Sequence, residues 1–210
     1  MNDVIERIKA QFSTVYLTLI SVIQASVLSY LMVCADGLLG SITLRTGLLL
    51  VTTFLIVVSC WNEYVMGSTT FRWVPTLVDS FLPFLIGASE FLMVRSLSRN
   101  GAAWYFFLAA FCVFGYLAFF NQYRAARRLP DNDVVFAALG QWTLASEILM
   151  LAVAVFSIVV GVIDGGLPLS SPARALLAVA TLGATVVYFI RTAFYWRRIT
   201  RHVQLRQVAK

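Results

Sequence analysis

Charged side chains are scarce in this sequence. They make up only 12% of its 210 residues, about half the share of a typical soluble domain, while 60% of the residues are hydrophobic. A soluble domain of this size has too much surface relative to its volume to hide so many apolar side chains. The scarcity of charge therefore excludes an ordinary soluble fold and indicates an integral membrane protein.

Histidine is nearly absent, since His202 is the only one. This excludes haem ligation by two histidines, HExxH zinc proteases and Ser–His catalysis. The sequence also has no P-loop, no GxGxxG after a strand and no closely spaced pair of acids within one helix. We therefore expect no cofactor and no metal site. Nothing nominates an enzyme, although a lipid-modifying enzyme stays open as a third alternative.

Cysteine is also rare, with Cys34, Cys60 and Cys112 all within or at the ends of apolar segments. An odd number of cysteines without CxxC spacing argues against a disulfide framework and against a metal site. We expect all three to pack as small hydrophobic side chains.

Long apolar runs dominate what is present. A bilayer core needs about 20 apolar residues per helix, and six windows meet this length: 12–33, 42–66, 74–94, 102–121, 135–162 and 173–195. Short junctions rich in glycine and proline separate most of them. We therefore predict an all-α fold in which residues 1–210 form a single transmembrane domain of six helices. Residues 196–210 would prolong the last helix as a basic amphipathic tail.

The basic residues indicate the orientation. Eleven of the 16 lysines and arginines fall on the side of the predicted bundle that holds both termini, and four fall on the other side. The positive-inside rule then predicts that both termini are cytoplasmic. The basic residues that give the chain its net charge of +6 would contact anionic lipid headgroups rather than nucleic acid. We expect the protein in a bacterial inner (plasma) membrane.

Acidic residues inside the predicted helices are the best candidates for function, because each costs about 2.5–3.5 kcal/mol to insert. Asp79 precedes Pro83 by four residues, so the carbonyl of Asp79 loses its helical donor and offers a second oxygen to a cation or water. Glu90 follows eleven residues later on the same helical face. These acids either form a cation or proton path, or hold helices together through arginines such as Arg191 or Arg72.

Three further polar residues join this set. Glu147 is predicted near the middle of window 135–162, at the depth of Gln24, where the two could share a hydrogen bond or a proton relay. Glu63, in the motif WNEY, is either a helix-end anchor or the cytoplasmic mouth of a path. Small residues form one stripe along the first helix, which is typical of close helix packing but would also suit a wet pore: Thr14, Thr18, Ser21, Ala25 and Ser29.

These features predict a small channel or transporter subunit that moves protons or cations. Six helices enclose only a narrow site, so we expect a homo-oligomer. The alternative is a non-catalytic sensor, anchor or assembly subunit of a larger complex, whose basic face receives a cytoplasmic protein partner.

Overall fold

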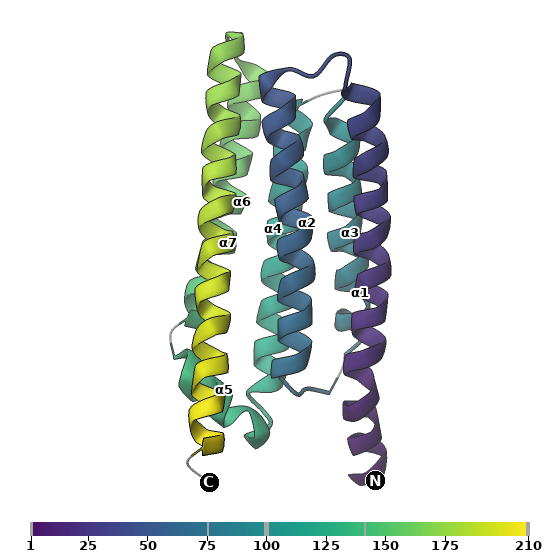
Figure 1. Cartoon of the computed structure of the whole chain (residues 1–210), viewed down its shortest axis with the longest axis vertical. Coiled ribbons are helices and arrows are strands. Elements are labelled where there is room, and N and C mark those ends of the chain that lie inside the picture. Colours follow the sequence, from purple (N-terminus) through teal and green to yellow (C-terminus); the bar gives the residue numbers. More distant parts are fainter. Residues whose placement is uncertain (1, 75, 99–100, 141, 209–210) are drawn as a thin grey trace.

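The computed structural model describes residues 2–74, 76–98, 101–140 and 142–208, and all the regular secondary structure in these ranges is helical. Six of its helices are long and apolar enough to cross a membrane, which confirms the predicted all-α class and the number of spans. Figure 1 shows them as one bundle, with both termini at the same end. The elements are α1 (Asn2–Leu38), α2 (Leu44–Thr70), α3 (Leu77–Ser96), α4 (Gly101–Ala126), η1 (Pro130–Asn132), α5 (Asp133–Leu139), α6 (Trp142–Gly166) and α7 (Ser171–Val208).

One predicted window does not form a single helix. The window 135–162 is divided between α5 and α6, and Gly140 ends α5 with a φ of 54°, in the left-handed region that favours glycine. Apolar residues lie on both sides of Gly140, so the hydropathy pattern could not reveal the break. Because α6 begins at Trp142, Glu147 lies less than two turns from the start of its helix instead of near the middle.

The last helix continues past its predicted membrane span. α7 runs to Val208, so residues 196–208 prolong it as expected. Arg197, Arg198 and Arg201 of the predicted basic tail are exposed, while the side chains from residue 202 onward lie outside the described residues.

The helices pack in a definite order. α1 contacts α2 and α3, while α4 lies between α3 and α6. α7 packs mainly on α2, and it contacts α6 much less, although α6 directly precedes it in the chain. We call the end of the bundle that holds both termini the terminal end, and the opposite end the far end (Figure 1).

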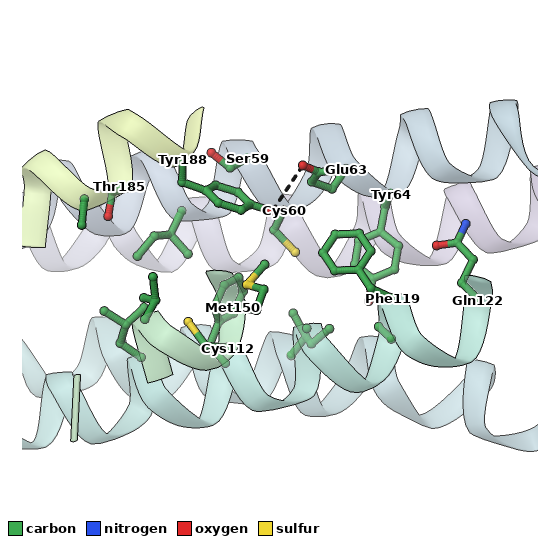
Figure 2. Close-up of a pocket in the computed structure, with 18 residues that line it drawn as sticks. Ser59, Cys60, Glu63, Tyr64, Cys112, Phe119, Gln122, Met150, Thr185 and Tyr188 are labelled. Atoms are coloured by element: carbon green, nitrogen blue, oxygen red, sulfur yellow. Dashed lines mark hydrogen bonds between the residues drawn. The ribbon is translucent and has the colours of Figure 1, made fainter. Parts of the chain in front are cut away.

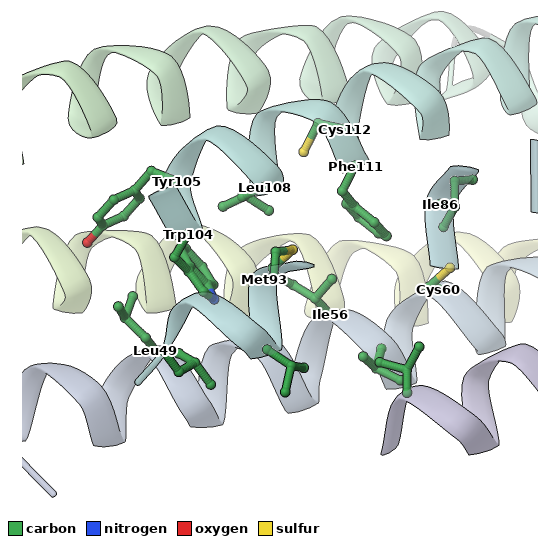
Figure 3. Close-up of a cluster of buried hydrophobic side chains, with 14 of the residues drawn as sticks. Leu49, Ile56, Cys60, Ile86, Met93, Trp104, Tyr105, Leu108, Phe111 and Cys112 are labelled. Carbon is green, nitrogen blue, oxygen red and sulfur yellow. The ribbon is translucent and has the colours of Figure 1, made fainter. Parts of the chain in front are cut away.

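Large buried side chains fill the half of the bundle nearer the far end. Figure 3 shows Leu49, Met93, Trp104 and Tyr105 meeting there from α2, α3 and α4. Trp104 is completely buried, and its indole Nε1 donates to Thr53 Oγ1 at 2.9 Å, so its donor is satisfied. This half of the bundle is a packed core.

The outer surface of the bundle is apolar. Many large hydrophobic side chains on α6 and α7 are exposed, among them Val155, Val162, Leu176 and Val187. Soluble monomers rarely expose such continuous patches, whereas lipid covers them. The small-residue stripe of α1 is also exposed: Thr14, Thr18, Ser21, Ala25 and Ser29. Within the chain, Ser21 Oγ accepts a hydrogen bond of 3.3 Å from Nε1 of Trp61 on α2.

A close approach of α1 to α3 depends on Gly87. A Cβ atom added to Gly87 would overlap Cγ2 of Ile23, the branch nearest the α1 backbone. A glycine at such a crossing lets two membrane helices come nearer than larger residues allow. The same crossing places Gln24, the neighbour of Ile23, opposite α3.

The first prediction concerns this crossing. Gly87→Ala should destabilise the protein by about 1–3 kcal/mol, because the added methyl forces α1 and α3 apart. Thermal unfolding of the purified protein in detergent measures the change. Ile23→Ala removes the opposing branch, so the double variant should be less destabilised than the two single losses combined. If the loss of stability in the double variant equals the sum of the two single losses, the added methyl group does not contact Ile23.

Candidate functional site

Glu90 of α3 is completely buried at the centre of the bundle. Its Oε2 accepts a hydrogen bond of 2.8 Å from Nε2 of Gln24 on α1, and the same nitrogen lies 3.5 Å from Sγ of Cys60 on α2. The remaining oxygens, Glu90 Oε1 and Gln24 Oε1, are buried and have no hydrogen-bond partner among the described residues. The site thus contains a carboxyl and an amide that each keep one acceptor unused.

The partner of Gln24 is therefore Glu90, not Glu147. This follows from helix order, since α1 packs on α3 and the α1–α3 crossing at Gly87 is only one turn from Glu90. Glu147 is half-buried on α6, near enough to Arg127 at the terminal end for the two charges to interact.

Asp79 is the third residue of α3, and neighbouring residues hold both of its oxygens. Oδ2 accepts from the backbone N (2.6 Å) and from Oγ1 (2.8 Å) of Thr76, while Oδ1 accepts from Nδ2 of Asn121 on α4 at 2.8 Å. Asp79 therefore caps α3 and links it to α4. Asp79 and Glu90 both lie on the buried face of α3, as their spacing predicts.

Arg72 and Arg191, the arginines expected to pair with Asp79, contact other residues. Arg72 lies 3.8 Å from Asp131 in an exposed ion pair. Arg191 donates to Oγ of Ser146 on α6 at 2.8 Å. The hydrogen bonds to the Asp79 carboxylate come instead from the neutral residues Thr76 and Asn121.

Glu63 joins α2 to α7. Its Oε1 accepts hydrogen bonds from Oγ1 of Thr192 at 2.7 Å and from the hydroxyl of Tyr188 at 3.2 Å. Figure 2 shows Glu63 and Tyr188 meeting at the edge of an internal cavity. Both hydroxyl donors fall on one oxygen, so Oε2 takes no hydrogen bond from the described residues.

The cavity, of about 80 Å³, lies between α2, α4, α6 and α7. A buried water needs roughly 10–15 Å³ by the same kind of measure, so this space holds several waters or one small molecule. Most of its lining is apolar, with polar groups from Ser59, Glu63 and Gln122. Cys60 lines the same cavity and contacts Gln24, so it connects the cavity with the Gln24–Glu90 pair.

Sequence reasoning missed a second charged cluster, at the far end. Asp164, in the last turn of α6, has a side chain only 2% exposed. Arg45 at the start of α2 donates to its Oδ2, and Nε of Arg174 at the start of α7 lies 3.4 Å from its Oδ1. A Cβ atom on Gly101, at the start of α4, would overlap the Arg45 guanidinium. The sequence did contain a signal for this cluster, because one acid and two arginines stand at predicted helix ends on the same side of the bundle.

These observations define the class: a polytopic helical membrane protein with several buried carboxyl groups, of which Glu63 lines a cavity between the helices. Among the described residues, no group of three or more His, Cys, Asp or Glu could hold a metal ion. Comparisons of the chain with protein-family models, curated proteins and solved structures find no match.

The second prediction tests the far-end cluster. Asp164→Asn should lower the free energy of unfolding by about 1–3 kcal/mol, because Arg45 is left partly buried without its counter-charge. Chemical unfolding in detergent measures the loss. Asp131→Asn is the matched control, because Asp131 and Arg72 are 56% and 68% exposed and such pairs contribute about 0–1 kcal/mol. Equal losses in both variants would contradict a special role for the buried cluster.

Proposed function

We propose that the protein is a small membrane transporter subunit that moves protons or cations, with Glu90 as its central binding group. The observation that carries the proposal is a fully buried carboxyl with an unused oxygen, beside an amide with an unused oxygen, next to a cavity. Ionisable residues inside a membrane are expensive to keep, and they commonly mark ion or proton pathways.

Gln24 supports this role because one neighbour can satisfy Glu90 in two states. When Glu90 is a carboxylate, the Gln24 NH₂ group donates to it, as the 2.8 Å hydrogen bond has it. When Glu90 carries a proton, its O–H can donate to Gln24 Oε1 after the amide turns over. The Gln24–Glu90 hydrogen bond can therefore be kept in both protonation states of Glu90.

The closed far end favours a transporter over an open channel. The cavity lies on the terminal side of the packed layer of Leu49, Trp104 and Tyr105, and the Asp164 cluster ties three helices beyond that layer. Access from the far side would require both layers to rearrange, as in alternating access. Glu63 would stand at the entrance, with Asp79 and Glu147 as outlying acids nearer the terminal end.

Orientation, location and assembly complete the proposal. The excess of arginine at the terminal end would face the cytoplasm, in contact with anionic headgroups of a bacterial inner membrane. The exposed small-residue stripe of α1 leaves a surface on which a second copy could pack closely. A homo-oligomer therefore belongs to the proposal.

The third prediction concerns transport. Proteoliposomes with the wild-type protein should show proton or cation flux under an imposed pH gradient or voltage. Glu90→Gln removes the exchangeable proton but keeps a neutral group of the same size, so flux should fall at least tenfold. A pH-sensitive dye inside the vesicles measures proton flux, and an ion-sensitive dye measures cations.

Asp131→Asn is the control for this assay, because it alters an exposed acid remote from Glu90. Size-exclusion profiles and helicity of each variant establish that the fold is kept. Unchanged flux in Glu90→Gln, or none in the wild type with either dye, would refute the proposal.

The alternative function is a non-catalytic subunit of a larger complex. One observation favours it: the acids Asp79, Glu90 and Glu63 all accept hydrogen bonds from neighbouring helices, as a purely structural role requires. Copurification of one stoichiometric partner with a flux-inactive wild type would support this alternative.

A further inference from the structure

The cavity contains polar atoms that the chain itself leaves unused. Ser59 is 3% exposed and lines the cavity, yet its Oγ has no hydrogen-bond partner among the described residues. This is unusual, because serines within helices commonly donate to the carbonyl four residues earlier, as Ser89 does to Leu85 at 2.8 Å. Buried hydroxyls without partners are expensive, so an unused one beside a cavity points to a ligand that completes it.

Glu63 adds a negative charge to the same lining. Its Oε1 is held by Tyr188 and Thr192, which fixes the orientation of the carboxyl group, while Oε2 takes no hydrogen bond from the described residues. Arg191 is near enough to interact electrostatically with Glu63, but its guanidinium donates to Ser146 of α6. The carboxylate oxygen Oε2 of Glu63 therefore remains available as a negatively charged hydrogen-bond acceptor, one turn from Ser59 on α2.

The walls of the cavity favour an organic cation. Four aromatic residues line it: Tyr64, Phe111, Phe119 and Tyr188. Aromatic faces attract cations, most strongly where water is excluded. A metal ion would need several oxygen ligands, and one carboxylate among mostly apolar side chains does not provide them.

The volume restricts the size of this cation. About 80 Å³ accommodates an ammonium group with a short alkyl body, but not a lipid or a drug-sized molecule. The ammonium would donate to Glu63 Oε2 and to Ser59 Oγ, which belong to residues one turn apart on α2. The alkyl body would lie against the aromatic and aliphatic walls.

We propose that this cavity binds a small primary alkylammonium ion, with Glu63 as the counter-charge and Ser59 as a hydrogen-bond acceptor. The inference rests on the proposed transport function and names the substrate class of that function. It assigns to Glu63 the recognition of the organic cation, whereas Glu90 is the buried proton or cation site.

The fourth prediction is an equilibrium binding test on the purified full-length protein in detergent, with radiolabelled methylammonium as the probe. The wild type should bind it saturably. Glu63→Gln keeps the acceptor for Tyr188 and Thr192 but removes the charge, so the affinity should fall at least tenfold. Ser59→Ala should weaken binding about threefold to tenfold, the equivalent of one hydrogen bond.

Ser89→Ala is the matched control, because Ser89 is a buried helical serine that does not line the cavity. It should bind methylammonium as the wild type does. Unlabelled ethylammonium should displace the probe, whereas equal concentrations of sodium should not. Displacement by sodium, unchanged affinity in Glu63→Gln, or no saturable binding to the wild type would each overturn the inference.

The outcome can be separated from that of the transport assay. Methylammonium binding that depends on Glu63, without flux of protons, cations or radiolabelled methylammonium in proteoliposomes, would support the binding site and refute the transport function. Flux that depends on Glu90, without methylammonium binding, would support transport and overturn the substrate class.

Discussion

A carboxyl group removed from water must find its hydrogen bonds within the protein, and this constraint organises the whole bundle. Glu90 meets it by accepting from α1, Asp79 by accepting from α4, and Glu63 by accepting from α7. Asp164 meets it through arginines of α2 and α7. Because lipid offers no driving force comparable to the hydrophobic effect in water, these polar contacts and close packing fix which helices are neighbours.

The fold followed from the sequence because its signals are local. The lengths of the apolar runs predicted six spans, and the face shared by Asp79 and Glu90 needed only helical geometry. The break at Gly140 was not predicted, since the apolar residues of the short helix α5 directly precede those of the next span. Gly140 itself was the visible signal of the break, but a prediction based on the spacing of apolar side chains takes no account of a glycine.

The pairings within the candidate site depend on helix order, which no local pattern contains. Gln24 could be matched to an acid only by depth, and depth suggested Glu147 instead of Glu90. The cap formed by Asp79 was readable in principle, because Thr76 precedes it by three residues. Its distance from the helix start depended on where α3 begins, and that boundary was placed a few residues too early.

The scarcity of contact between α6 and α7 has a mechanical consequence. α7 is fastened to α6 near the far end through Arg174 and Asp164, and near the terminal end through Arg191 and Ser146. Between these two links α7 has few contacts with α6, while its other side packs on α2. Both α6 and α7 line the cavity along this stretch. A small shift of α6 away from α7 there would therefore widen the cavity while both links stay intact.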